Sequence, residues 1–248
     1  GASEDGRALL DGADAAVADI VIGADGIRST VRRSLFGEEP LRYGGHRAWQ
    51  AGTRFDDERV RERFVEVWGV GGGFGPAGAD RVYWYCFEAV PDGAPAPHRP
   101  RDEFLRRYGA WFDPIPALIE STDPDAIEPT FTYDRRPRRS WGRGRVTLLG
   151  DAAHPMKPNI GQGAAQALED AVVLASCVAG SGDPEEALRA YERRRVGRAN
   201  AVVRASRRVG RVAEVRSPLG ARVRDAFIKA LPDRLAIAPQ RRIAEFRP

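Results

Sequence analysis

The stretch GDAAHPMKPNIGQG, residues 150–163, is the part of the sequence that decides the fold. The apolar run before it, residues 145–149, has the composition of a buried strand. The segment after its turn, residues 161–179, is rich in small residues and predicts a helix that Gly180 ends. A carboxylate placed by such a turn lies at the carboxyl end of a strand, where α/β sheets bind ligands. The stretch therefore predicts an α/β fold with a ligand-binding edge.

Within this stretch, different groups suit different parts of one ligand. On the Gly-Asp pair alone Asp151 would be a turn former, but in the full stretch its carboxylate suits a sugar-like hydroxyl. The free N–H groups of the helix start, from Gly161 to Ala164, favour an acceptor that gains negative charge, and glycines there let a flat ligand touch the backbone. We interpret His154 as a positioning or packing residue and not as a base.

A second informative stretch, ADIVIGADG at residues 18–26, indicates a short buried strand that runs into a glycine-rich turn. Ser29 is expected to cap a helix over residues 29–36, and Gly37 to end it. Asp25, inside the turn, also fits an ordinary Asp-Gly turn.

Between these stretches, from about Tyr43 to Phe131, glycine and proline separate β-prone runs, which predicts a sheet-rich domain. We expect strands at residues 63–68 and 81–87 and a helix at residues 101–112. The glycines of residues 71–75 follow a strand, but no helix-forming run follows them. We therefore interpret them as a turn and not as a dinucleotide loop.

The C-terminal part is helical and basic. Asp183 and Pro184 start a long helix, one face of which is marked by Leu188, Tyr191, Arg195, Val202 and Val209. Residues 189–248 hold 17 Lys or Arg against 5 Asp or Glu. Because these cations alternate with valines and lack stacking aromatics, we favour a solvated helix face over an anionic partner, and we expect no nucleic acid.

Composition excludes several classes of protein. The 248 residues are 42% hydrophobic and 30% charged, which is enough for one large or two small domains with real cores. No apolar run is long enough to span a membrane and the start lacks a signal-peptide pattern, so we expect no stable membrane insertion and a cytoplasmic location. Cys86 and Cys177 have no disulfide or metal spacing, so we expect reduced core residues and no metal.

The two stretches together resemble the FAD-dependent monooxygenases of the para-hydroxybenzoate hydroxylase class. The likeness is greatest to the branch with salicylate hydroxylase, 3-hydroxybenzoate 6-hydroxylase, urate hydroxylase and zeaxanthin epoxidase. Residues 150–170 resemble the second FAD motif of this family, in which Asp151 would hold the ribityl chain and the turn at Pro158 and Gly161 would meet the flavin ring. Residues 23–29 resemble its Asp-Gly motif, which is implicated in NAD(P)H binding.

The resemblance implies an α/β (α+β) architecture. A partial Rossmann-like FAD-binding domain would comprise residues 1–40 and 136–182, with a β-sheet substrate domain inserted at residues 41–135 and a C-terminal helical region at residues 183–248. Cofactor contacts are expected at Asp151, Pro158, Gly161, Gln162, Gly163, Ala164, Asp25 and Arg28. The substrate wall is expected at Trp49, Tyr83, Tyr85 and Phe87, for each of which core packing is an equal alternative.

The activity implied by the resemblance is oxygen transfer. FAD would be reduced by NADH or NADPH, react with O2 to a C4a-hydroperoxyflavin, and transfer one oxygen atom to an aromatic or other electron-rich small molecule, by hydroxylation or epoxidation. Since the flavin carries this chemistry, no residue is assigned as catalytic with certainty. Relatives often carry Arg after the Ala-Trp pair, where this chain has Gln50, so a neutral aromatic or polyketide-like ring fits as well as an anionic one.

One departure from the family is the Gly-x-Gly-x-x-Gly loop, which lies near the family's N-terminus and which this sequence does not contain. Met156 is the only methionine, so we expect a further N-terminal segment, and weak or no FAD retention until that segment is supplied. Two alternatives stay open: a flavin-dependent halogenase or reductase of the same fold, and a non-catalytic truncated remnant.

Overall fold

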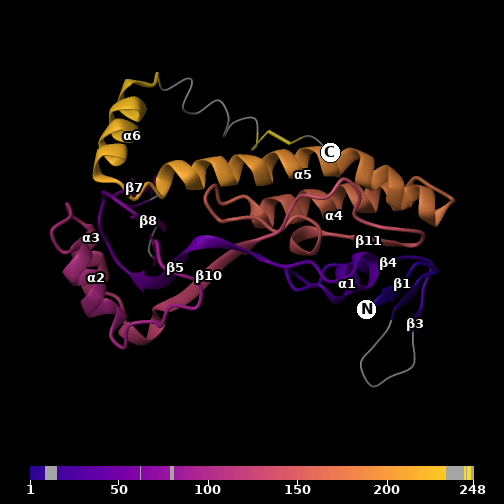
Figure 1. Ribbon diagram of the computed structural model, residues 1–248, viewed down its shortest axis with the longest axis horizontal. Coiled ribbons are helices and arrows are strands. Elements are labelled where there is room, and N and C mark those ends of the chain that lie inside the picture. Colours follow the sequence, from indigo (N-terminus) through magenta and orange to yellow (C-terminus); the bar gives the residue numbers. More distant parts are fainter. Residues whose placement is uncertain (9–15, 62, 79–80, 233–242, 244, 247–248) are drawn as a thin grey trace. The chain divides into compact units, whose positions relative to one another are not determined.

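The chain forms two compact units in a computed structural model that describes residues 1–8, 16–61, 63–78, 81–232, 243 and 245–246 (Figure 1). Unit 1 comprises Gly1–Arg42, Tyr133–Gly210 and Leu231–Pro248, and unit 2 comprises Tyr43–Thr132 and Arg211–Ala230. The helical segment 183–248, expected as a region of its own, is instead divided between the two units. Among the described residues, no helix is long and apolar enough to cross a membrane.

Unit 1 is built on two parallel strands, β4 (Val21–Gly23) and β11 (Val146–Leu148), with Thr147 opposite Ile22. They are the strands expected before the two motifs, so the carboxyl ends of both strands lie at one edge. A small antiparallel sheet of β1 (Ala2–Ser3), β2 (Arg7–Ala8) and β3 (Ala16–Val17), which the sequence did not predict, precedes them. The expectation that the first strand is buried is wrong in part, because Ile22 is 39% exposed.

The predicted helix starts and ends of unit 1 lie within two residues of the observed ones, the largest difference being the start of the predicted helix 161–179, which begins at Gly163. In α1 (Thr30–Phe36), the Ser29 hydroxyl accepts from the Arg32 N–H at 2.8 Å, and Gly37 ends the helix at φ 76°. A 3₁₀ turn η2 (Gly150–Ala152) leads to α4 (Gly163–Ala179), followed by α5 (Pro184–Ala213). The predicted inner face of α5 is confirmed for Leu188, Tyr191, Arg195 and Val202, which are at most 2% exposed.

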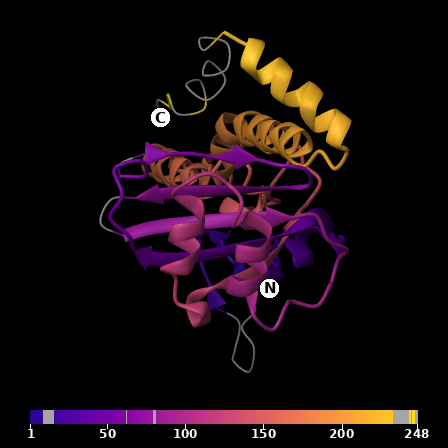
Figure 2. The ribbon, with the colours of Figure 1, turned by 90° about the vertical axis from the view of Figure 1, so that its left-hand side faces the viewer.

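Unit 2 is a six-stranded sheet covered by two helices. The strand order is β10-β5-β9-β8-β6, with β7 also paired to β8. The strands are β5 (Arg42–Arg54), β6 (Arg63–Phe64), β7 (Val67–Trp68), β8 (Gly72–Gly78), β9 (Arg81–Glu88) and β10 (Glu128–Asp134). Helices α2 (Pro100–Tyr108) and α3 (Ile115–Glu120) lie in front of this sheet in Figure 2. A short 3₁₀ turn, η1 (Pro124–Ala126), precedes β10, and helix α6 (Pro218–Ala230) follows α5 along the chain.

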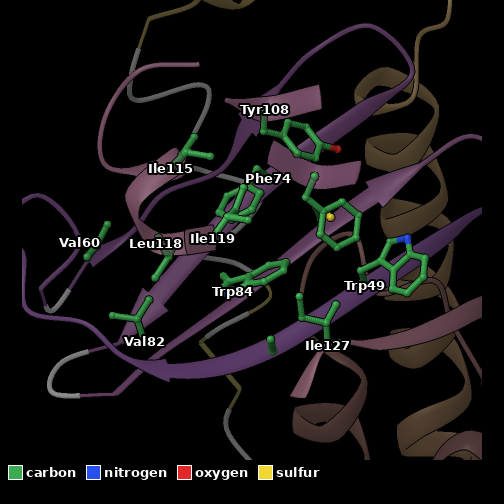
Figure 3. Packing of buried hydrophobic residues seen from close by; sticks show 13 residues of the cluster. Trp49, Val60, Phe74, Val82, Trp84, Tyr108, Ile115, Leu118, Ile119 and Ile127 are labelled. Carbon is green, nitrogen blue, oxygen red and sulfur yellow. The ribbon is translucent and has the colours of Figure 1, made fainter. Parts of the chain in front are cut away.

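Aromatic side chains fill the space between the unit 2 sheet and α2 and α3 (Figure 3). Phe74 stacks on Trp84 with ring centroids 5.2 Å apart, and Phe104 meets Trp84 edge-on at 6.0 Å. The Trp84 indole N–H donates to the Thr122 hydroxyl at 2.9 Å, which satisfies a donor that burial would otherwise leave unpaired. Cys86 lies in this core and Cys177 is half-buried; both are free thiols, as expected.

The interpretation of residues 71–75 as a turn is wrong. Only Gly71, at φ 67°, lies in the turn, and the following glycines belong to strand β8. The cause is the neighbouring strand β9, the rings of which lie over the glycines. A Cβ at Gly73 would stand 2.6 Å from the Phe87 ring, and one at Gly75 would stand 2.6 Å from the Tyr85 ring. Glycine, which weakens an ordinary strand, is therefore the residue that this strand requires.

Two other predicted elements are shorter than expected. The helix predicted over residues 101–112 ends at Tyr108, because Gly109 follows it and the Gly109 N–H caps the Leu105 carbonyl at 2.8 Å. The strand predicted over residues 63–68 is interrupted at Val65 and Glu66, which separates β6 from β7.

Candidate cofactor site

The Gly-Asp turn presents one carboxylate to solvent. Gly150 adopts φ 61°, a left-handed conformation that favours glycine, directly after strand β11. Ala152 and Ala153 are buried at no more than 1% exposure, whereas Asp151 between Gly150 and Ala152 is exposed. The turn thus buries its apolar members and directs a charged oxygen-bearing group outward, as the sequence predicts for a hydroxyl-binding carboxylate.

A buried ionic network of Asp170, His154 and Arg195 holds this turn in place. One oxygen of Asp170, on α4, accepts from the Gly150 N–H at 3.0 Å and pairs with His154 Nε2 at 2.6 Å, and its other oxygen accepts from Arg195 Nε at 2.7 Å. Burial alone would raise the pKa of Asp170. The hydrogen bond and charge of His154, together with hydrogen bonds from the Arg195 side chain and the Gly150 backbone, outweigh burial and hold the pKa of Asp170 below its usual range. His154 is buried and its Nε2 faces Asp170, which agrees with its interpretation as a positioning or packing residue.

Arg32 connects the two motifs within unit 1. Its Nη1 donates to the carbonyls of Ala152 and Ala153 at 2.9 and 3.0 Å, and its Nε donates to Glu39 at 3.0 Å. The residue is only 2% exposed, so the guanidinium is a fixed structural group. The helix that follows the Asp-Gly motif therefore holds the Gly-Asp turn in place.

The Asp25 carboxylate is engaged by the start of α1. Its Oδ2 accepts from the Thr30 N–H at 2.7 Å, the Thr30 hydroxyl at 3.0 Å and the Val31 N–H at 3.2 Å. Partial burial acts to raise the pKa of Asp25, but hydrogen bonds from Ser29, Val31 and Thr30 outweigh it and lower that pKa. At least one oxygen of Asp25 thus stabilises the helix, which agrees with the alternative of an ordinary structural turn. A cofactor role for Asp25 remains a prediction.

The start of α4 has the space and the donors for a flat anionic group. The expectation that the Gly161 N–H is free is wrong, because it donates to the Pro158 carbonyl at 2.8 Å and closes a turn in which Gly161 adopts φ 63°. A Cβ built at Gly161 or Gly163 would meet no atom within 4 Å, so the space above both glycines is open. The N–H groups of the first helical turn, from Gly163 onward, lack intrahelical acceptors and carry the positive end of the helix dipole. These residues fit a flavin ring.

A cavity of about 230 Å³ beside the Asp-Gly motif is lined by Arg28, Arg32, Arg33 and Arg135 with the loop of residues 37–41. Arg32 and Arg135 already donate hydrogen bonds within the protein. Arg32 Nη1 donates to the Ala152 and Ala153 carbonyls, and Arg135 Nε donates to the Ile27 carbonyl at 3.0 Å. Arg28 is exposed, and Arg33 lies 4.0 Å from exposed Glu38. Glu38 and Glu39 also line the cavity and pair with Arg33 and Arg32, so the positive charge at its rim comes chiefly from exposed Arg28.

In unit 2, alternate residues of β9 form an aromatic face opposite the core. Tyr83, Tyr85 and Phe87 share one face, whereas Trp84 and Cys86 point into the core. The expectation that Trp49 belongs to the same wall is wrong. Trp49 pairs with Cys86 across the strands, is 1% exposed, and donates its indole N–H to Glu88 at 2.9 Å. Trp49 is therefore a core residue of unit 2, which is the alternative that the sequence left open.

Polar groups accompany the exposed end of this aromatic face. Tyr83 is 47% exposed, and its hydroxyl donates to Gln50 Oε1 at 3.1 Å. Burial raises the pKa of Glu66, although hydrogen bonds to Trp68 and Tyr85 act in the opposite direction. Burial also raises the pKa of Tyr85, and the charge and hydrogen bond of Glu66 add to that rise. A carboxyl, an amide oxygen and two phenols thus gather on one face of the sheet.

Sequence reasoning placed Arg195 on the inner face of its helix, but it assigned no supporting role in these sites to Arg32, Glu66, Asp170 or Arg195. For Arg195 a signal was present, because an arginine within an apolar helix stripe needs a buried partner. For the others the partners are too distant in sequence to be paired by spacing. Within the described part of the chain, no cluster of His, Cys, Asp or Glu could hold a metal ion.

The chain belongs to the FAD binding domain family, the model of which matches residues 5–206. It is 40% identical over 232 residues to the aurachin C monooxygenase/isomerase of Stigmatella aurantiaca, covering 93% of this chain and 61% of that protein. It is also 40% identical over 179 residues to a chloroplastic zeaxanthin epoxidase of Solanum lycopersicum, covering 67% of this chain and 26% of that protein. The chain thus spans less than two thirds of these relatives.

Solved structures agree with the family and with the predicted fold class. HpxO from Klebsiella pneumoniae, crystallised with FAD and uric acid, superposes with a TM-score of 0.89 at 27% identity, over 98% of this chain and 64% of that one. A salicylate hydroxylase substrate complex gives a TM-score of 0.68 at 26% identity, over 83% of this chain and 57% of that one. The α/β FAD-binding fold is therefore confirmed.

Proposed function

We propose that this chain is part of an FAD-dependent monooxygenase that uses NADH or NADPH and O2 to hydroxylate or epoxidise an electron-rich small molecule. The observation that carries the proposal is the exposed Asp151 carboxylate beside the open, glycine-lined start of α4, in a chain of the FAD binding domain family. The relatives named as a monooxygenase and an epoxidase support the reaction class.

The residues of unit 1 have separate tasks in this proposal. Asp151 accepts hydrogen bonds from ribityl hydroxyls, and the N–H groups of the α4 start donate to the part of the ring that becomes negative on reduction. Bound FAD supplies electron transfer and oxygen activation. Pro158 and Gly161 shape the turn against which the ring lies, and Gln162 and Ala164 complete the helix start.

The arginine-lined cavity is proposed as a site for the phosphates of NADH or NADPH. Arg28 and Arg33 can bond phosphate oxygens in bidentate fashion, which lysines in their place could not do. Either nicotinamide cofactor fits this description, since both carry the same pyrophosphate.

A further strand and helix are proposed to complete unit 1 and to supply the Gly-x-Gly-x-x-Gly loop. The Val21 N–H and the Gly23 carbonyl bond to the β11 segment at 2.8 and 2.9 Å, so the Ile22 backbone groups point to the other edge, where no described strand pairs. Parallel sheets are normally covered on both faces, yet Ile22 is 39% exposed. On α4, Leu168 and Val172 are 70% and 52% exposed at helical spacing.

The aromatic face of unit 2 is proposed to bind a neutral ring that carries N–H or O–H donors. Tyr83 and Tyr85 offer flat contact area, and Gln50 and Glu66 offer acceptor oxygens beside them. Arg54 and Arg81, which face each other across the strands, lie at the end of the strands, about 13 Å from Tyr85 at the usual strand rise. An anionic ring at Tyr85 would therefore meet the carboxyl of Glu66 while these two arginines lie about 13 Å away.

The test is a flavin absorbance spectrum after incubation with FAD and desalting, taken for this chain and for a form extended upstream by about one Rossmann unit. We expect only the extended form to stay yellow and to oxidise NADH or NADPH faster when neutral phenols or N-heterocycles are added. The proposal fails if neither form retains flavin. Retention without any oxygen incorporation into a broad panel of ring compounds would point to a reductase or halogenase instead.

A further inference from the structure

Helix α6 is attached to unit 2 by its polar side. Only Ala221 and Arg224 are buried among its thirteen residues. The Arg224 guanidinium donates to the carbonyls of Gly69 at 3.1 Å, Trp68 at 3.2 Å and Ala213 at 3.2 Å. The hydrogen bonds found between this helix and its unit thus come from Arg224, and Ala221 is its one buried apolar residue, whereas a surface helix normally buries an apolar stripe against its domain.

The apolar side of α6 faces solvent instead. Leu219, Val223 and Phe227 are 70%, 62% and 67% exposed. They recur at intervals of four residues, so at about 100° per residue they fall within an arc of about 80° on one face. Ala230 also falls inside this arc, and Ala226 lies at its edge. Three large side chains this exposed in one stripe mark a surface that meets something apolar.

The flank of this apolar stripe is basic. Arg222 and Lys229 are exposed and lie next to the stripe on the helix circumference, on the side away from Arg224. The one acidic residue of the helix, Asp225, is paired with Arg224 Nε at 2.8 Å. A partner that covers the stripe therefore also meets two cations whose charge no residue of the helix neutralises.

We propose that α6 is a docking surface for an anionic lipid bilayer, with Leu219, Val223 and Phe227 entering the acyl boundary and Arg222 and Lys229 contacting headgroup phosphates. A helix of thirteen residues is about 20 Å long, which suits an orientation parallel to the membrane plane. The proposal does not depend on flavin or on the reaction assigned above.

A second copy of the chain fits this surface less well. A two-fold contact through the stripe would bring the basic flanks of both copies into one interface. No carboxylate of α6 is free to neutralise them, because Asp225 is paired with Arg224. One narrow stripe of a short helix also offers much less than the roughly 1,000 Å² that a stable dimer buries.

The test is co-sedimentation of the full chain with vesicles of phosphatidylcholine alone and of phosphatidylcholine mixed with phosphatidylglycerol. We expect binding to the mixed vesicles only, weakened by added salt. Leu219→Ser or Phe227→Ser should weaken binding about tenfold, and neutralising Arg222 or Lys229 with Gln about fivefold each. Phe112→Ser is the matched control for Phe227→Ser, because Phe112 is 60% exposed against 67% for Phe227 and lies outside α6, and it should leave binding unchanged.

Three results would overturn the proposal. The first is no sedimentation with mixed vesicles while the circular dichroism spectrum shows a folded chain. The second is equal loss of binding in Phe112→Ser and Phe227→Ser, which would show unspecific hydrophobic adhesion. The third is a concentration-dependent dimer that Leu219→Ser abolishes without vesicle binding, which would make a second copy the occupant.

Discussion

Asp170 and His154 are joined by a 2.6 Å hydrogen bond inside unit 1, and neither side chain is exposed. The same Asp170 oxygen accepts from the Gly150 N–H, so one buried atom holds both ends of the turn that carries Asp151. The position of the exposed carboxylate is thus set by a residue on α4 that contacts no solvent. Stability of unit 1 and presentation of Asp151 consequently depend on the same charge.

Asp170→Asn is expected to lower the free energy of unfolding by about 2–3 kcal/mol, because it removes one of the two carboxylates that pair with buried Arg195 and the charged acceptor of His154. Urea unfolding followed by circular dichroism measures the change. Asp5→Asn is the control, since Asp5 pairs with Arg7 on the surface, with both side chains more than half exposed. An equal loss in both variants would contradict the role of the buried network.

The same carboxylate predicts a pH dependence. The pKa of Asp170 in the folded chain lies below its ordinary value of 3.8, so its contribution is complete above that value and is lost as the pH falls below it. The difference in unfolding free energy between the native chain and Asp170→Asn should therefore be constant from neutral pH down to about pH 4 and shrink below it. A difference that stays constant down to about pH 2 would contradict this assignment.

The sequence predicted those elements in which local pattern and tertiary environment agree. The strand before Gly150, the helix that ends at Gly180 and the cap at Ser29 follow from apolar runs and helix-end residues, which act over a few positions. The inner face of α5, including Arg195, followed from helical periodicity in the same way.

What the sequence could not predict depends on residues that are distant along the chain. The glycines of strand β8 indicate a turn because glycine weakens strand formation, and only the register with Tyr85 and Phe87 reverses that preference. The face on which Trp49 lies is set by its pairing with Cys86 of β9, so the sequence of β5 alone cannot predict that Trp49 points into the core. Pairing across strands is not recorded in either strand alone.

Gly75→Ala is expected to destabilise unit 2 by about 1–3 kcal/mol, because the added methyl group would overlap the Tyr85 ring. Gly52→Ala is the matched control. Gly52 lies on strand β5, where it pairs with Tyr83 of β9, and its added Cβ would meet no atom within 4 Å. Thermal unfolding of both variants tests the pair. A cost at Gly52 as large as at Gly75 would show that backbone conformation, and not the aromatic ring, requires glycine.

Glu66→Gln is expected to raise the free energy of unfolding at neutral pH. Burial raises the pKa of Glu66 in the folded state, so the folded chain favours the protonated carboxyl, and this preference costs stability as the pH rises through that pKa. The amide removes the cost while keeping an acceptor for the Tyr85 hydroxyl. The stabilisation should disappear below about pH 4, where the carboxyl is protonated in both states; denaturant unfolding across this range measures it. Equal stability of both proteins at neutral pH would contradict the prediction.

Asp151 and Asp25 should respond oppositely to removal of their carboxylates. Asp151 is exposed and has no hydrogen bond within the described part of the chain, so Asp151→Ala should leave the unfolding free energy unchanged. Loss of its bonds to ribityl hydroxyls should weaken FAD binding about 10–100-fold in the form of the protein that retains FAD. Asp25→Ala should instead cost about 1 kcal/mol of stability, because the α1 N–H groups of Thr30 and Val31 lose their acceptor. Titrating FAD by flavin fluorescence and unfolding both variants in urea separates the two effects. If Asp151→Ala destabilised the fold but bound FAD normally, its carboxylate would be a structural group and the proposed site would be misplaced.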